Sequence, residues 1–279
     1  MNRVLVLGSS GQIGTYLVEY LRGKEYEVFE FDIENNKLED LRIQRNSYLE
    51  KLLENSDFVF FLAFDVGGSH YLEKYQDSSD FVINNLQIMS NTFESLRRFK
   101  KPFIFASSQM SNMNHSTYGK LKSIGEQATN SLNGRVVHFW NVYGFETKPE
   151  KYHVISDFIS KAKATGQIEM RTSGEESREF LFAQDCCAGL EILMKEFYSI
   201  PKDLPLHLTS FESNTVLEVG EIIGNIYGAK VIPGLKIDNV QRGHVNKPDR
   251  SILKYWKPET TLKATEIITI FEYESELKV

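Results

Sequence analysis

Continuous apolar runs recur along the first half of the chain, at residues 4–7, 58–63 and 102–106. A run without polar alternation is typical of a strand that is buried on both faces of a parallel sheet. Between these runs, residues 13–21 and 81–99 carry apolar side chains three and four positions apart, which predicts helices that bury one face. Alternation of such strands and helices predicts an α/β fold.

The same alternation continues to the end of the chain. Further strands are predicted at residues 28–32, 136–140, 179–183 and 204–208, and further helices at 46–53, 117–131, 154–164, 185–197, 216–227 and 262–271. We therefore predict a doubly wound, Rossmann-type parallel sheet with a smaller C-terminal cap. The sheet domain is expected to comprise residues 1–145, with 178–210 returning to it, and the smaller region residues 146–177 and 211–279.

Composition narrows the class of protein. The 279 residues suffice for a large core, and the formal net charge of −6 argues against nonspecific binding to nucleic acid. No apolar run approaches the roughly 18 residues that a membrane-spanning helix needs, and no targeting segment is expected before the first strand. The adjacent Cys186 and Cys187 suit neither a disulfide nor a metal site. We expect them to be reduced core residues of a cytoplasmic protein without a metal.

Gly8, Gly11 and Gly14 stand between the first predicted strand and the first predicted helix. Glycines let the backbone approach a pyrophosphate, and the free N–H groups and dipole of a helix start favour its charge. Asp32 follows Gly14 by 18 residues, near the usual spacing for a carboxylate that binds the adenosine ribose hydroxyls. This carboxylate would repel a 2′-phosphate, so the motif predicts NAD rather than NADP. An ordinary strand–turn–helix without a ligand is the alternative.

A second group of polar residues follows the strand predicted at 102–106. Ser107 and Ser108 end this strand, and Tyr118 and Lys122 share one face of the next helix. Ligands of doubly wound sheets bind outside the carboxyl ends of the strands. A tyrosine with a pKa near 10 is a poor base, but a neighbouring ammonium and an oxidised nicotinamide both favour the phenolate. Ser108 would donate to the same substrate oxygen, although a solvated helix face would also explain the pair.

Together these motifs resemble the extended short-chain dehydrogenase/reductase family, in its nucleotide-sugar epimerase/dehydratase branch. The resemblance rests on Gly8-x-x-Gly11-x-x-Gly14, Ser107-Ser108 and Tyr118-x-x-x-Lys122, with support from residues 62–63, Asn85, 141–144, 178–180 and 242–243. It extends from residue 1 to about residue 270 and implies NAD as cofactor. The sheet domain would then bind NAD and the smaller region a nucleotide sugar.

The resemblance implies a role for each matching residue. The catalytic residues would be Ser108, Tyr118 and Lys122, with Lys122 also bonding the nicotinamide ribose. The implied cofactor-binding residues are Gly8, Ser10, Gly11, Gln12, Ile13, Gly14, Asp32, Ile33, Asp40, Leu41, Leu62, Ala63, Phe64, Asn85, Ala106, Ser107, Tyr118 and Lys122. Asn141, Arg178 and Arg242 match positions that bind the nucleotide-sugar diphosphate, whose oxygens suit a guanidinium fork. A surface salt bridge is the alternative for either arginine.

Three departures from the family pattern affect the sugar site. Only ten positions separate Ser108 from Tyr118, where relatives have a longer loop, so we expect an opened or reshaped sugar pocket. Gln109-Met110 replaces the acidic pair of 4,6-dehydratases, which disfavours dehydration. His138 stands where many relatives have arginine, and we expect it to be a core residue.

Asp65 and His70 follow the third strand and are candidate sugar contacts.

These observations predict an NAD-dependent epimerase that acts through a keto intermediate. The reacting centre would be C4 of a nucleotide-activated sugar, in polysaccharide or sugar-nucleotide biosynthesis. A net NAD-dependent dehydrogenase or reductase with the same site is the first alternative, and a non-catalytic NAD-binding protein is the second. We expect neither a nucleic-acid nor a membrane partner. The resemblance suggests a homodimer that pairs the helices at 81–99 and 117–131.

Overall fold

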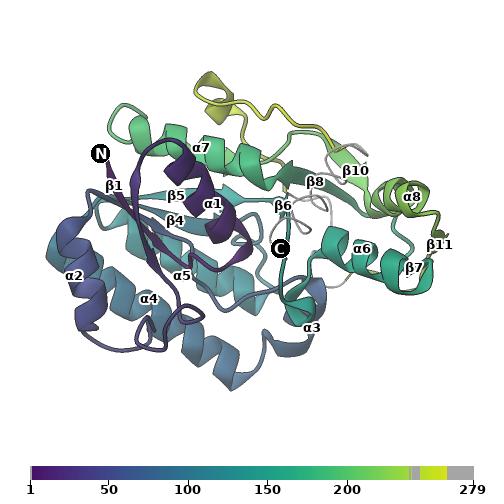
Figure 1. Ribbon diagram of the computed structural model, residues 1–279, viewed down its shortest axis with the longest axis horizontal. Coiled ribbons are helices and arrows are strands. Elements are labelled where there is room, and N and C mark those ends of the chain that lie inside the picture. The colour runs from purple at the N-terminus through teal and green to yellow at the C-terminus, as the bar shows by residue number, and fades with distance from the viewer. Residues whose placement is uncertain (1, 239, 241–245, 263–279) are drawn as a thin grey trace.

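The centre of the molecule is a six-stranded sheet in the order β2-β1-β3-β4-β5-β9, with every neighbouring pair parallel (Figure 1). Its strands are β1 (Arg3–Leu7), β2 (Glu27–Phe31), β3 (Phe58–Phe61), β4 (Phe103–Ser108), β5 (Gly134–Phe139) and β9 (His207–Leu208). The computed structural model describes residues 2–238, 240 and 246–262. The predicted Rossmann-type α/β fold is confirmed.

Helices cover both faces of this sheet (Figure 1). On one face lie α1 (Gln12–Gly23) and α7 (Ala183–Lys195), and on the other α2 (Ser47–Asn55), α4 (Ser79–Phe99) and α5 (Thr117–Asn130). Alternate residues of one strand therefore enter different cores: Val4 and Val6 pack toward α1 and α7, whereas Leu5 and Leu7 pack toward α2 and α4. Burial on both faces explains the continuous apolar runs.

A third hydrophobic cluster lies beyond the carboxyl edge of the large sheet. It is built mainly from α6 (Val154–Thr165), β7 (Gln167–Glu169), β8 (Ser177–Phe182) and α8 (Val216–Tyr227). This part of the molecule contains two small sheets, with the strand orders β10-β8-β6 and β11-β7. Their remaining strands are β6 (Asn141–Tyr143), β10 (Ser213–Thr215) and β11 (Lys230–Ile232). Within residues 178–210, α7 and β9 join the large sheet, but β8 pairs with β6 and β10 instead.

The structure differs from the predicted elements where the segments are short. The helix α3 (Ser69–Tyr75) and the 3-10 helices η1 (Pro149–Lys151) and η2 (Ser251–Lys254) carry too few apolar positions for a periodic signal. The strand predicted at 204–208 contracts to β9, since Pro205 supplies no N–H for pairing. The helix predicted at 262–271 lies outside the described residues. Among the helices of the described ranges, none is long and apolar enough to cross a membrane.

Candidate active site

A cavity of about 1320 Å³ opens at the carboxyl ends of β1, β3 and β4 and continues between the sheet and α6. This is the position at which doubly wound sheets bind ligands. Pockets for a single small molecule typically enclose roughly 300–1,000 Å³. The cavity therefore has room for a dinucleotide and a second ligand beside it.

The glycine turn forms one end of the cavity floor. Gly8 has a φ of +87°, and a side chain there would place its Cβ 2.7 Å from the backbone nitrogen of Ala63. A Cβ on Gly14 would lie 2.0 Å from the carbonyl oxygen of Gly8. The helix α1 then begins at Gln12, and its N-cap residue Gly11 has no side chain to cap it. The first turn also contains no acid, so the free N–H groups of the helix start are available at the cavity.

Gln12 adds a donor to this helix start. Its Nε2 is buried and has no hydrogen-bond partner among the described residues, yet the residue lines the cavity. An unsatisfied buried donor is costly, and a phosphate oxygen at this place would satisfy it. The backbone cradle, the uncapped helix and the free amide together fit the pyrophosphate of a dinucleotide.

Asp32 lies beside this turn, directly after β2. Its Oδ2 accepts a hydrogen bond of 3.0 Å from the N–H of Ser10, and its Oδ1 accepts one of 3.0 Å from the N–H of Glu34. Glu34 also lines the cavity and pairs with Lys148 at 2.6 Å. Two carboxylates at this end make it unfavourable for an additional phosphate on the ribose.

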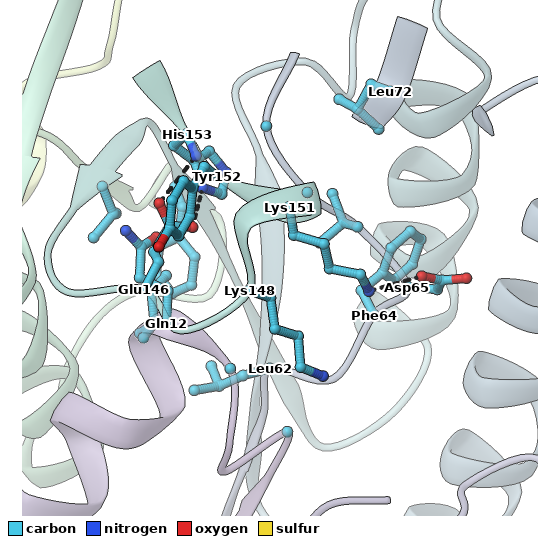
Figure 2. A pocket seen from close by; sticks show the side chains of 18 of the residues that line it. Gln12, Leu62, Phe64, Asp65, Leu72, Glu146, Lys148, Lys151, Tyr152 and His153 are labelled. Carbon is cyan, nitrogen blue, oxygen red and sulfur yellow. Dashed lines mark hydrogen bonds and ion pairs between the residues drawn. The ribbon is translucent and has the colours of Figure 1, made fainter. Parts of the chain in front are cut away.

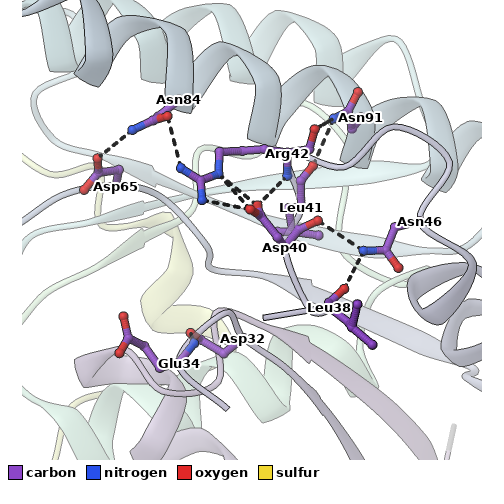
Figure 3. Close-up of polar contacts among 10 residues, drawn as sticks. All are labelled: Asp32, Glu34, Leu38, Asp40, Leu41, Arg42, Asn46, Asp65, Asn84 and Asn91. Carbon is purple, nitrogen blue, oxygen red and sulfur yellow. Dashed lines mark hydrogen bonds and ion pairs between the residues drawn. The ribbon is translucent and has the colours of Figure 1, made fainter. Parts of the chain in front are cut away.

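The next part of the wall carries a polar network that the sequence did not reveal (Figure 3). Arg42 pairs with Asp40 at 2.8 Å, and its Nη1 donates to Oδ1 of Asn84 at 3.2 Å. Burial acts to raise the pKa of Asp40, but the hydrogen bonds and charge of Arg42 outweigh burial and lower it. Asp40 and Leu41 line the cavity, as does Arg42. Arg42 thus holds the carboxylate of Asp40, for which the resemblance implied a contact with the cofactor.

Asn85 does not line the cavity, unlike the other described residues for which a cofactor contact was implied. Its side chain is fully buried and bonds to backbone on every side. Oδ1 accepts the N–H of Asp65 at 2.8 Å, and Nδ2 donates to the carbonyls of Asp65 and Phe81 at 3.1 and 3.0 Å. Asn85 therefore stabilises the loop after β3 by these hydrogen bonds, whereas its neighbour Asn84 lines the cavity.

Ser108, Tyr118 and Lys122 meet at the centre of the cavity. Ser108 ends β4, and the side chain of Ser116 caps the start of α5 by accepting the N–H of Gly119 at 3.0 Å. Ser108 is hydrogen-bonded to the Tyr118 hydroxyl. The Lys122 Nζ lies 5.7 Å from the centroid of the Tyr118 ring and donates to the carbonyl of Ala106 at 2.6 Å.

Burial sets the charge of this group. It raises the pKa of Tyr118 to about 12, against the opposing effect of the Ser108 hydrogen bond. It also lowers the pKa of Lys122 to about 7, against the opposing charge of Glu126. Without another positive charge the phenol keeps its proton, whereas a cationic ring bound beside it would favour the phenolate. The arrangement can therefore exchange a proton in response to a bound ligand.

The short connection between Ser108 and Tyr118 folds as a series of tight turns. Backbone hydrogen bonds of 2.9 to 3.0 Å join Ser111 to Ser108, Met113 to Met110 and Ser116 to Met113. Met110 and Met113 are buried, and Met110 lines the cavity. The reshaped pocket wall thus presents a thioether, which has no proton to donate.

Two of the three implied diphosphate residues lie in the described part of the chain, and both line the cavity. Arg178 on β8 pairs with Asp238 at 2.5 Å, and Asn141 on β6 donates to the carbonyl of Glu179 at 3.3 Å. Arg242 lies outside the described residues. Asp238 also lines the cavity. Its carboxylate therefore already pairs with the Arg178 guanidinium, which the resemblance implies as a ligand of the diphosphate.

Residues 146–153 form another wall that periodicity did not reveal (Figure 2). His153 bonds to Glu146 through Nδ1 at 2.7 Å and through its backbone N–H at 2.9 Å. Lys151 pairs at 3.1 Å with Asp65, which also accepts the hydroxyl of Tyr71 at 2.7 Å. Asp65 is therefore engaged in fixing this wall.

Glycines allow this wall to meet the loop after β3. A Cβ on Gly68 would lie 2.1 Å from the carbonyl oxygen of Tyr152, and one on Gly67 would lie 3.1 Å from the Cα of Lys151. The backbone N–H of Gly68 donates to the carbonyl of Lys151 at 2.9 Å. The paired glycines are the signal from which this contact could have been suspected. His70, the other candidate sugar contact, lines the cavity nearby.

Comparison with known proteins agrees with this geometry. Residues 4–204 match the sequence model of the NAD dependent epimerase/dehydratase family, and the chain belongs to that family. Its Rossmann-type fold and its NAD cofactor are those predicted from the sequence, and the resemblance to nucleotide-sugar-modifying extended short-chain dehydrogenases is confirmed.

Individual relatives differ in their reactions. GDP-mannose 3,5-epimerase of Arabidopsis thaliana is 25% identical over an alignment that covers 99% of this chain and 83% of the relative. A GDP-6-OMe-4-keto-L-xylo-heptose reductase from Campylobacter jejuni has 16% identity and a TM-score of 0.84, with 99% and 98% of the two chains covered. The Thermus thermophilus UDP-glucose 4-epimerase in complex with NAD has 18% identity and a TM-score of 0.77, covering 98% and 99%. The two solved structures share the fold, and the reaction has to be argued from this chain's residues.

Proposed function

We propose that the protein is an NAD-dependent epimerase that acts at C4 of a nucleotide-activated sugar through a keto intermediate, in sugar-nucleotide or polysaccharide biosynthesis. The observation that carries the proposal is that Ser108, Tyr118 and Lys122 line the same cavity as the glycine turn. This arrangement offers a proton acceptor and a dinucleotide cradle to one substrate. It is also the arrangement that a simple binding protein would not need.

The residues divide the chemistry between them. NAD held by the glycine turn and Gln12 would supply a hydride acceptor for the carbinol carbon and, once reduced, a hydride donor for the ketone. The Tyr118 phenolate takes the hydroxyl proton, so a C–H and an O–H bond are exchanged for a C=O bond. Ser108 holds the same oxygen in line, and Lys122 stabilises the phenolate by its charge. Epimerisation follows when the ketosugar presents its other face before reduction.

The wall beside Tyr118 supports epimerisation over dehydration. Dehydration needs an acid that protonates a leaving hydroxyl. Gln109 and Met110 follow the catalytic serine, and the Met110 side chain lines the cavity. Neither an amide nor a thioether supplies such a proton.

A net dehydrogenase or reductase is the second candidate. It would use Tyr118 and Ser108 in the same way but would release the ketone or the alcohol. Its site would need the same residues, so the presence of Ser108 and Tyr118 in the cavity is equally compatible with this candidate. A non-catalytic NAD-binding protein is the third, and the presence of Tyr118, Lys122 and Ser108 in one cavity speaks against it.

The test incubates the purified protein with UDP-, GDP-, CDP- and dTDP-sugars and follows the products by NMR. We expect conversion of one sugar without accumulation of NADH, abolition of turnover in Tyr118→Phe, and unchanged turnover in Tyr48→Phe, which alters an exposed tyrosine on α2. Stoichiometric NADH would favour the dehydrogenase. Equal turnover by Tyr118→Phe, or no turnover of any sugar, would overturn the proposal.

We further propose that residues 146–177 and 211–279 bind the nucleotide sugar.

We also propose that two copies of the chain associate through α4 and α5. Ile83 and Leu86 on α4 are 51% and 40% exposed, and Ile124 on α5 is 51% exposed. Light scattering should report a dimer that dissociates in Ile124→Asp and persists in Leu38→Asp, an equally apolar exposed site elsewhere. A monomeric wild-type chain would contradict the association.

A further inference from the structure

Glu126 is a half-buried carboxylate one helical turn after Lys122 on α5. Ser107, the neighbour of Ser108 on β4, donates its hydroxyl to Oε1 of Glu126. His138 on β5 approaches the same oxygen through Nε2 at 3.0 Å. Burial acts to raise the pKa of Glu126, but the hydrogen bonds from His138, Ser107 and Ser111 outweigh burial and lower it. Glu126 therefore carries a negative charge near neutral pH.

The partner on β5 orients this carboxylate. His138 stacks on His207 of β9, with ring centroids 4.7 Å apart and planes at 14°. Nδ1 of His138 is buried and has no hydrogen-bond partner among the residues described, so a proton there would be an unsatisfied donor. A proton on Nε2 can be donated to Glu126, and this contact holds the carboxylate in place.

The second imidazole of the stack, His207, is neutral near pH 7. The indole N–H of Trp140 donates to Nδ1 of His207 at 3.1 Å, which leaves that nitrogen as an acceptor. Burial and the proximity of His138 lower the pKa of His207 to about 4, although Asp249 and Glu126 oppose this. The two stacked rings thus hold the Glu126 carboxylate in one orientation.

Lys122 is the cation toward which this charge acts. Its Nζ lies 3.8 Å from the ring centroid of Phe64 and 5.1 Å from that of Phe105, and it donates to the carbonyl of Ala106. Those neighbours, together with the Tyr118 hydroxyl, are uncharged in the ligand-free protein. Glu126 is the charged group that opposes the desolvation of the ammonium.

We propose that Glu126 is a positioning residue, which keeps the positive charge on Lys122 while the Ser107 hydroxyl and the His138–His207 stack hold its carboxylate in place. The inference extends the proposed function, because a charged Lys122 is what makes Tyr118 a usable base. It does not depend on the identity of the sugar. The charge of Lys122 is measurable in the protein alone.

The experiment titrates Lys122 by NMR in protein labelled with ¹⁵N at the lysine Nζ, with Lys122→Arg identifying its signal. In Glu126→Gln we expect the Lys122 titration to move down by about one pH unit, as expected for loss of a nearby opposite charge. Glu191→Gln is the matched control, because it removes a buried carboxylate that is bonded to Tyr20 and Tyr26 instead. It should leave the Lys122 signal in place.

Further variants keep the inference falsifiable. If Glu126→Gln fails to fold by circular dichroism, Glu126→Asp, which retracts the charge by one methylene, should lower the Lys122 titration by a smaller amount. An unmoved Lys122 titration in the folded variant would overturn the inference, as would an equal movement in Glu191→Gln. A shifted titration in a protein that converts no nucleotide sugar would sustain the inference about Glu126 and reject the proposed epimerase.

Discussion

The ammonium of Lys122 lies 3.8 Å from the centroid of the Phe64 ring. The ring comes from the loop after β3 and also meets Tyr118 edge-on, with centroids 5.6 Å apart. A buried ammonium loses hydration, and the face of an aromatic ring returns part of that stabilisation. Phe64 thus supports the charge of the same lysine that the catalytic proposal uses.

Replacing the Phe64 ring should lower the turnover rate near neutral pH. In Phe64→Leu the loss of the cation–π contact, on the order of 1 kcal/mol, should lower turnover at pH 7 by about fivefold. It should also move the alkaline limb of the pH–rate profile to lower pH, because Lys122 then loses its proton more readily. The matched control is Phe99→Leu, which removes the contact of Arg98 with Phe99 at 5.4 Å on the far end of α4. A pH–rate profile measures the effect, and equal losses in both variants would contradict it.

A side chain at Gly14 should abolish binding of NAD. In Gly14→Ala the new Cβ would lie 2.0 Å from the carbonyl oxygen of Gly8, so the turn has to move, at a cost of about 3 kcal/mol or more. Gly23→Ala, at the other end of α1, meets nothing within 4 Å and should leave binding unchanged. Calorimetric titration with NAD and thermal unfolding separate the two variants. Normal NAD affinity in Gly14→Ala would show that the turn is not the cradle.

The pairing of Glu146 with His153 predicts a pH dependence of stability. Burial acts to lower the pKa of His153 and to raise that of Glu146, but their mutual attraction and hydrogen bonds outweigh burial for both groups. The contribution of His153 is therefore complete below its unfolded pKa of about 6.5 and is lost as the pH rises through its higher folded value. The contribution of Glu146 is complete above about pH 4.5 and is lost as the pH falls through its lower folded value.

Urea unfolding of the wild type and of His153→Gln between pH 4 and pH 9 tests this dependence. We expect the difference in unfolding free energy to be largest between about pH 4.5 and pH 6.5 and to shrink toward pH 9. His115→Gln, in the turn before α5, is the control and should show no such maximum. A difference that grows with rising pH would contradict the ion pair.

Removing the partner of Arg178 should strengthen the binding of a diphosphate. In Asp238→Asn the guanidinium keeps its place in the cavity but loses the carboxylate at 2.5 Å, so we expect about fivefold tighter binding of UDP or GDP. Asp157→Asn is the control, because Asp157 also lines the cavity but pairs with Lys161 at 2.7 Å. Isothermal titration calorimetry measures the affinity of both variants for UDP and GDP. Unchanged or weaker binding in Asp238→Asn would indicate that Arg178 does not contact the phosphates.

The parts of the site that the sequence predicts are those with a local pattern. The turn from Gly8 to Gly14 lies between a strand and a helix, and Tyr118 and Lys122 share one helix face, so neighbours along the chain reveal them. Val216–Tyr227 is also bounded as predicted, because a capping box begins it and Gly228 ends it.

The parts that escaped prediction depend on contacts between distant segments. Asn85 has the position of a ligand-binding residue, but only the folded loop shows that its amide bonds to the backbone of Asp65. The roles of Arg42 and Asp238 in the site follow only from their ion pairs with Asp40 and Arg178, which the folded structure forms. His138 looked like a core residue, and its role beside Glu126 depends on a stack with His207, which is remote in sequence.

The backbone of Gly68 meets that of residues 151–152 without an intervening side chain. This seam joins the half of the molecule that holds the dinucleotide to the half that would choose the sugar. Selectivity for a new carbohydrate therefore has to evolve through side chains that leave the seam intact. In the proposed mechanism, insertions that thicken it would separate the reacting sugar hydroxyl from Tyr118.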